Sequence, residues 1–224
     1  MSRTRWTIGV ILALLGCGLA LHAVSAQQFA QPARQVRVGD VDLASSRVYM
    51  LVGKTGFGHE HGVVGQLQSG HILLGQPQNA GELVFDMKSF SADDDAARKY
   101  VGLKGSTDNN TRQQVNDNML GAAVLNVARF ATATYTIDSA LPLQPQPGDK
   151  VAYYLLKGTL TLAGVARPVQ LKCEVIPVGD AVRVRTGFLL KQTDYGIKPF
   201  SKAFGAVGVA DEMKVYGELV IANK

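Results

Sequence analysis

The segment Gly56-Phe-Gly-His-Glu-His-Gly62 holds the one cluster of side chains in this sequence that could bind a metal. His59 and His61 occupy alternate positions, so in a strand their imidazoles would point to the same side, and His71 could reach them across a hairpin. Three imidazoles could bind zinc or copper. No fourth ligand is identifiable and the flanking glycines favour a turn, so a polar rim or a hydrogen-bonding site for a ligand head group are alternatives. No metal is assigned, and His59, His61 and His71 stay as candidates.

Other polar groups predict no catalytic site. Asp93, Asp94 and Asp95 are consecutive and point in different directions, and at a helix start they would complement the helix dipole, so capping and solvation are predicted for them. The glycines of residues 53–58 lack the spacing of a phosphate-binding loop. No serine lies in an elbow motif typical of hydrolases. These residues therefore support neither a carboxylate site, nor a nucleotide-binding loop, nor a hydrolase triad.

The first 26 residues have the three parts of a secretory signal peptide. Arg3 and Arg5 precede an apolar run from Trp6 to Leu21, and small residues follow, with Ala26 as the last. We predict cleavage after Ala26 and export of the mature chain.

Two other interpretations of this segment are open. The apolar run is near the lower length limit for an uncleaved membrane anchor. Leu14-Leu-Gly-Cys17 resembles the site at which a lipoprotein is cut before a lipidated cysteine, although the residues after Cys17 stay apolar where a polar spacer is usual.

The mature chain is expected to be a single domain. Residues 27–40 show no periodicity and predict a flexible lead-in, and residues 41–224 are enough for one domain with its own core. The formal charge of +5 falls by two when Arg3 and Arg5 are removed, and the small positive charge that is left does not favour nucleic-acid binding.

Cys173 has no partner once Cys17 is removed, and it alternates with aliphatic residues, so a buried thiol is predicted.

Hydrophobicity alternates with period two over most of the chain, which predicts half-buried antiparallel strands. In the C-terminal part these strands cover residues 153–162, 169–176, 182–190 and 213–221. Earlier strands are predicted at 46–54, 62–67, 72–74, 82–87 and 130–138. Frequent glycines in the first half favour the bends of a barrel over a flat sandwich.

Two short helices are predicted in a polar insertion between these strands. They cover residues 96–100 and 111–120, the second with Thr111 as its N-cap, and a proline-rich loop follows at 141–148. The fold class is thus all-β, an antiparallel barrel of about eight strands with a short helical insertion.

Several stretches, in order over residues 42–222, resemble the YceI-like family. They are Leu160-Thr-Leu-Ala-Gly-Val-Ala-Arg-Pro-Val169, residues 119–135, Arg185-Thr-Gly-Phe188 and Thr193-Asp-Tyr-Gly-Ile197. The resemblance implies a lipocalin-like barrel in the bacterial periplasm that holds polyisoprenoid or quinone-like chains without catalysis. The sequence departs from the family pattern at Ala131, where a proline is usual, and in the histidine-rich segment 56–62.

On this basis the predicted function is that of a periplasmic carrier for an isoprenoid- or quinone-type lipid. Inward-facing positions of the predicted strands give a candidate cavity lining: Leu83, Phe85, Met87, Tyr135, Leu156, Leu160, Val184, Phe188 and Leu219. These residues could equally fill a dry core. No cofactor is expected apart from the bound lipid, no nucleic acid and no stable membrane insertion are expected, and a homodimer is left open.

Two alternative functions remain. The protein could be a metal-binding or redox-accessory protein of the cell envelope that uses the His59-Glu60-His61 cluster. It could also be an envelope stress protein that acts through a partner surface.

Overall fold

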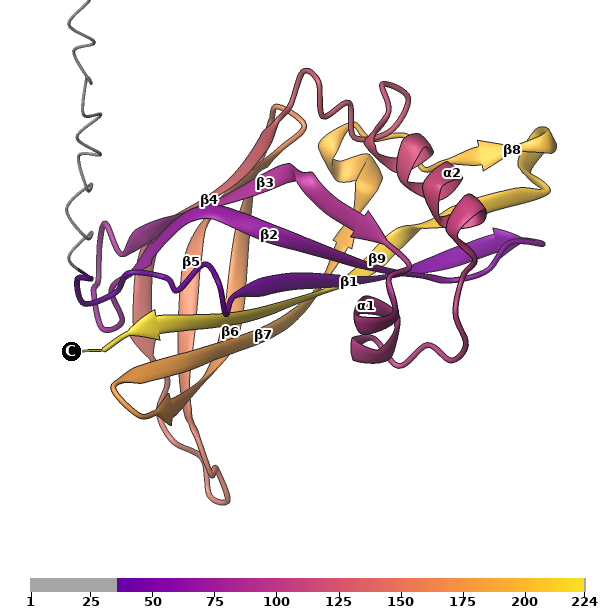
Figure 1. Ribbon diagram of the computed structural model, residues 1–224. Helices are drawn as coiled ribbons and strands as arrows, with labels where there is room; N and C mark the ends of the chain where they lie inside the picture. Colours follow the sequence, from indigo (N-terminus) through magenta and orange to yellow (C-terminus); the bar gives the residue numbers. More distant parts are fainter. Residues whose placement is uncertain (1–35, 224) are drawn as a thin grey trace, which may run out of the picture. The chain divides into compact units, whose positions relative to one another are not determined.

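Antiparallel strands dominate residues 36–223, the part of the chain that the computed structural model describes (Figure 1). The predicted signal peptide, Cys17 and most of the predicted lead-in lie outside these residues. The strands are β1 (Arg47–Gly56), β2 (His61–Ile72), β3 (Gly81–Ala92), β4 (Thr132–Pro142), β5 (Ala152–Leu162), β6 (Val165–Val178), β7 (Ala181–Lys191), β8 (Ser201–Lys202) and β9 (Val207–Ala222).

The sheet closes on itself. Each strand from β1 to β7 pairs with the next, β7 pairs with β9, and β9 returns to pair with β1 through residues such as Tyr216 and Tyr49. The two-residue strand β8 pairs with β9 outside this ring. The result is an eight-stranded antiparallel barrel, which confirms the predicted fold class.

Side chains alternate between the interior and the surface, as the sequence period predicts. On β6, Leu171, Cys173 and Val175 are buried, whereas Gln170, just before them, and Lys172, between the first two, are exposed. Each strand thus contributes one apolar row to the barrel interior. Phe90 also enters this interior, and it can do so because Gly65 opposite has no side chain: a Cβ there would lie 2.5 Å from the Phe90 ring.

Several predicted boundaries differ from the structure. The predicted strand 62–67 is part of a longer strand, β2, which ends at Ile72, and no separate strand exists at 72–74 because residues 73 and 74 lie after that end. Strand β3 continues to Ala92, beyond the predicted end at residue 87. Its pairing with β2 contains register shifts, which interrupt the alternation of inward and outward side chains although the strand itself continues. Strand β8 is too short to leave a periodic signal in the sequence.

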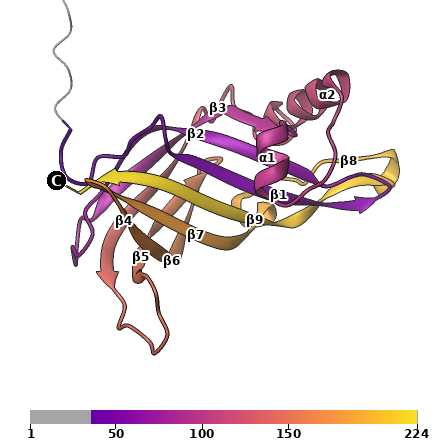
Figure 2. The same ribbon diagram turned by 60° about the horizontal axis from the view of Figure 1, so that its bottom comes forward.

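Two helices lie between β3 and β4. Helix α1 (Asp95–Tyr100) packs on the outside of the barrel against β1 and β2 (Figure 2). Helix α2 (Asn109–Leu120) is tied to the end of β3, where the Asn116 Oδ1 accepts a hydrogen bond of 2.7 Å from the Ala92 N–H. Its N-cap is Asp108, whose side chain accepts from the Thr111 N–H, so the prediction of Thr111 as the N-cap is wrong. No helix of the described segment is long and apolar enough to cross a membrane.

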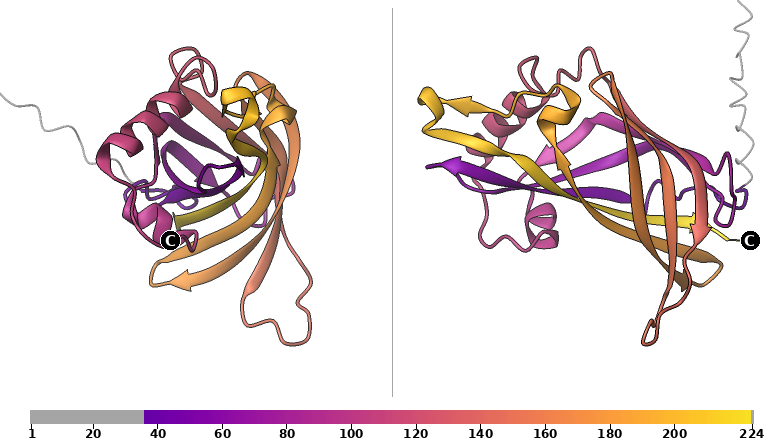
Figure 3. Two further views of the ribbon diagram at one scale, coloured as in Figure 1. Left: turned by 90° about the vertical axis from the view of Figure 1, so that its right-hand side faces the viewer. Right: turned by 180° about the vertical axis from the view of Figure 1, so that it is seen from behind.

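The two ends of the barrel differ. At one end Ile72, Ile137 and Ile221 are almost fully buried, and the end of the predicted lead-in is held there because the Gly39 N–H donates to the Ala222 carbonyl over 2.8 Å. At the other end, which we call the mouth, lie α2 and the segment 192–208 (Figure 3). This segment contains two 3₁₀ turns, Gln192–Tyr195 and Ala203–Gly205.

Candidate functional site

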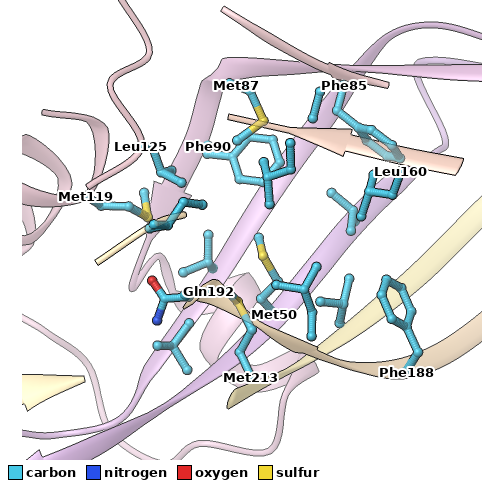
Figure 4. A pocket seen from close by; sticks show the side chains of 18 of the residues that line it. Met50, Phe85, Met87, Phe90, Met119, Leu125, Leu160, Phe188, Gln192 and Met213 are labelled. Atoms are coloured by element: carbon cyan, nitrogen blue, oxygen red, sulfur yellow. The ribbon is translucent and has the colours of Figure 1, made fainter. Parts of the chain in front are cut away.

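A cavity of about 310 Å³ occupies the barrel interior. Its walls are almost entirely apolar, and they include side chains from every strand of the ring together with α2 (Figure 4). A well-packed core leaves few voids larger than a water molecule, so a cavity of this size exceeds an ordinary packing defect and is large enough to admit a small apolar group.

The nine residues predicted to line a cavity all border this one: Leu83, Phe85, Met87, Tyr135, Leu156, Leu160, Val184, Phe188 and Leu219. Their placement follows from strand parity, which sends alternate side chains inward. Contact between these residues and a ligand stays a prediction.

The cavity has further lining residues that the prediction did not include. Four of the five methionines in the sequence line it: Met50, Met87, Met119 and Met213, of which only Met87 was predicted. Met50 and Met213 have the inward parity of their strands, so the period could have identified them. Met119 and Leu125 come from α2 and the turn after it, and their position depends on how the insertion folds over the mouth. Methionine side chains are flexible and polarisable, and they adapt to ligands of irregular shape.

Two potentially reactive groups in the wall are inert. Burial raises the pKa of Cys173 to about 11, although a hydrogen bond with Thr186 acts in the opposite direction, so the thiol stays protonated at neutral pH. This agrees with the predicted buried thiol. Burial also raises the pKa of Tyr135, whose hydroxyl donates to the Val169 carbonyl over 3.1 Å and lies 3.3 Å from the Leu156 carbonyl. Neither group offers a nucleophile to a ligand.

Polar side chains border the cavity near the mouth. Asn118 lies on α2, and Gln192 is buried, with its Nε2 donating to the Ala210 carbonyl over 2.8 Å. His59 and His61 also line this end of the cavity. An elongated apolar ligand with a polar head could therefore place its head at the mouth.

The two histidines converge on a buried carboxylate. The Asp93 Oδ2 lies 2.7 Å from the His61 Nδ1 and 3.4 Å from the His59 Nε2. Its other oxygen, Oδ1, accepts from the Gly62 N–H and from the Arg98 guanidinium, each over 3.1 Å. The Asp93 side chain is fully buried, whereas the His59 side chain is 49% exposed, so the cluster opens toward solvent on the His59 side.

The charge of Asp93 is set by these partners. Burial by itself would raise the pKa of this carboxyl, but the hydrogen bonds and charges of His61, Gly62 and Arg98 outweigh burial and lower the pKa from 3.8 to about 2. Asp93 is therefore ionised at neutral pH. It also has a positive φ of 60°, which few non-glycine residues adopt.

This cluster corrects two predictions. Of the three aspartates, Asp94 caps α1 as predicted, since its Oδ1 accepts from the Ala97 N–H over 2.7 Å, but Asp93 is neither a cap nor solvated. His71 does not reach His59 and His61, because it lies at the opposite end of β2 with its Nδ1 3.3 Å from the Asp40 Oδ1.

Among the described residues, His59, His61 and Asp93 form the one group that could hold a metal, with donor atoms within 4.8 Å of one another.

The fold and the cavity define the class of protein, an eight-stranded antiparallel barrel with an apolar interior. The chain belongs to the YceI-like family: residues 40–221 match the model of the YceI-like domain.

Relatives named protein YceI from Salmonella arizonae and Salmonella newport are each 31% identical over 100 residues, which are 45% of this chain and 47% of the relative. The match thus spans about half the length of each of these relatives.

Solved structures show the same fold at lower identity. BcnA of Burkholderia cenocepacia is 19% identical with a TM-score of 0.51, and the likeness covers 82% of this chain and 100% of BcnA. A polyisoprenoid binding domain from Saccharophagus degradans is 17% identical with a TM-score of 0.56, over 84% of this chain and 100% of that domain.

Proposed function

We propose that this protein binds one isoprenoid- or quinone-type lipid inside the barrel and carries it without a covalent step. The observation that supports this most is the cavity of about 310 Å³ with an almost wholly apolar wall. Transfer of each methylene-sized unit from water into such a wall is favourable by about 0.8 kcal/mol, so a prenyl chain needs no charged partner to be held. The flexible methionines of the wall suit a ligand with a branched, repeating chain.

The polar groups near the mouth suit the head of such a lipid. Gln192, His59 and His61 can offer hydrogen bonds to a quinone carbonyl or a hydroxyl while the chain fills the apolar interior. The polyisoprenoid binding domain of Saccharophagus degradans, which shares the fold, supports the same class of ligand.

We also propose that the protein acts in the periplasm, after cleavage behind Ala26. Amino-terminal sequencing of the exported protein should then begin at Gln27. A chain that keeps residue 1, or one that begins at a lipid-modified Cys17, would contradict this proposal.

Mass spectrometry of the lipid extracted from natively purified protein tests the proposed ligand class. We expect a prenyl lipid in an amount approaching one molecule per protein, and none from protein that was unfolded and washed. A barrel that carries no lipid and takes up no prenyl alcohol or prenylquinone in solution would overturn the proposal.

Metal binding is a second candidate function, supported by the convergence of the donor atoms of His59, His61 and Asp93. It would make the protein a metal-binding or redox-accessory protein. The Arg98 guanidinium, 3.1 Å from the Asp93 Oδ1, opposes a divalent cation at this carboxylate by charge repulsion. We therefore place the metal function second.

Calorimetric titration with zinc and copper discriminates the two functions. Metal binding predicts one equivalent bound by the wild type and loss of binding in a His59→Ala/His61→Ala variant, with His71→Ala as the matched control. Lipid carriage alone predicts no stoichiometric uptake in any of these proteins.

A further inference from the structure

Two turns project together at the mouth of the barrel. One is the β1–β2 turn, and the other is the segment that contains β8 and the second 3₁₀ turn; we call residues 54–60 and 198–207 together the tip. The two turns are joined, since Gly56 pairs with Val207 and the Phe57 N–H donates to the Ala206 carbonyl over 2.8 Å. In Figure 1 the tip extends to the right, beyond α2.

The tip presents two phenyl rings to solvent. Phe57 is 90% exposed, and Phe204 is fully exposed. Phe204 and its neighbour Ala203 both have positive φ, of 55° and 51°, a conformation that is strained for residues with a side chain. The fold thus holds a large apolar side chain outward in a strained turn, which is the reverse of what folding stability alone would favour.

The charge of the tip is positive. It carries the exposed lysines Lys54, Lys198 and Lys202 and a single acid, Glu60. The Lys202 Nζ lies 5.5 Å from the centre of the Phe200 ring, so cationic and aromatic groups are interleaved. Exposed aromatic rings with lysines beside them are the combination that binds the interface of an anionic bilayer.

The tip is continuous with the cavity. Phe200 and Val207 belong to the tip, and they line the cavity together with Gly208, the next residue. A surface that bound the tip would therefore lie against the mouth, close to the polar residues that we assign to the ligand head.

We propose that the tip docks reversibly on the surface of a bilayer that contains anionic lipids, with Phe57 and Phe204 inserted at the headgroup level. The inference rests on the proposed function in one respect: a bilayer is the source or destination of a prenyl lipid that water cannot dissolve. Lysines and phenyl rings match an anionic lipid surface, and their position at the mouth would let a lipid pass between bilayer and cavity with little exposure to water.

Vesicle co-sedimentation tests the docking. The chain from Gln27 onward is used, since residues 36–223 form a closed barrel with their own core, and the apolar run 6–21 would bind vesicles by itself. We expect binding to phosphatidylcholine vesicles that contain phosphatidylglycerol, weaker binding in high salt, and weaker binding to phosphatidylcholine alone. The Phe57→Ser/Phe204→Ser variant should lose at least about fivefold in the vesicle-bound fraction.

A matched control replaces two exposed apolar side chains at the opposite end of the barrel. The Leu141→Ser/Val178→Ser variant should bind vesicles as the wild type does. Prenyl-probe uptake in detergent-free solution should be unchanged in the Phe57→Ser/Phe204→Ser variant, so failure of docking and failure of lipid carriage are distinguishable. Wild-type protein that ignores anionic vesicles, or a tip variant that binds them fully, would overturn the docking proposal.

Discussion

Asp93 receives hydrogen bonds from two elements and is held ionised inside the protein. Its native pKa of about 2 lies below the value of 3.8 taken for the unfolded chain, so on acidification the unfolded chain takes up this proton first. The stability that Asp93 contributes is therefore present above about pH 4 and is lost as the pH falls toward 2.

Asp93→Asn removes this contribution. At neutral pH we expect the free energy of unfolding to fall by about 2 kcal/mol, because the interactions of the carboxylate with His61, Gly62 and Arg98 are weakened or lost, and the variant should show less loss of stability between pH 4 and 2. Urea denaturation at several pH values measures both effects.

Asp95→Asn is the matched control, since Asp95 is exposed in the first turn of α1 and should change stability by less than about 0.5 kcal/mol. Equal effects of the two substitutions would contradict the role given to Asp93.

Cys173 gives a second residue-scale prediction. Its pKa of about 11 and its burial predict that a thiol reagent at about pH 8 modifies the native protein very slowly and the denatured protein at once. Time-resolved labelling of the chain from Gln27 onward measures this. Rapid modification of the native protein would show that the wall of the cavity opens or that the thiol is ionised.

The strands could be predicted from the sequence, and the site at the mouth could be predicted only in part. Period-two patterns identify inward positions such as Leu160 and Phe188 without knowledge of the partner strands. Asp93 has no such signal. Its inward direction depends on a positive φ at the end of β3 and on the approach of α1, and neither is encoded by local periodicity. Met119 is unpredictable for a similar reason, because α2 faces the mouth through tertiary packing.

The contact between α1 and β2 depends on Gly62. A Cβ at this position would lie 2.9 Å from the backbone N and Cα of Arg98, so only glycine allows the helix to approach the strand this closely. The approach also brings the Arg98 guanidinium to Asp93.

Gly62→Ala should therefore destabilise the protein by about 1 to 3 kcal/mol through displacement of α1. Thermal or urea unfolding measures the loss. Gly187→Ala is the control, because a Cβ at Gly187 would meet its nearest neighbour at 3.6 Å, an ordinary contact. If the two alanine variants are equally stable, the close approach of α1 is not needed for the fold.

The molecule as a whole combines a sealed end, an apolar interior and a polar mouth. Closure of the sheet leaves none of the ring strands as an open edge, so the protein can keep a cavity in its core without the strand-to-strand association that an open sheet invites. Stability is supplied by the strand pairing and the wall, and the interior is left free for a ligand.

Uptake of a fluorescent prenyl probe by protein freed of lipid, compared between matched tryptophan variants, tests lipid binding in the cavity most directly. Leu160→Trp adds bulk inside the cavity and Lys157→Trp adds the same bulk on the outer face of the same strand. We predict saturable uptake by the wild type and by Lys157→Trp, and an affinity at least about tenfold weaker in Leu160→Trp, with circular dichroism showing that both variants fold. Equal uptake by the two variants, or no uptake by the wild type, would contradict a lipid held inside the barrel.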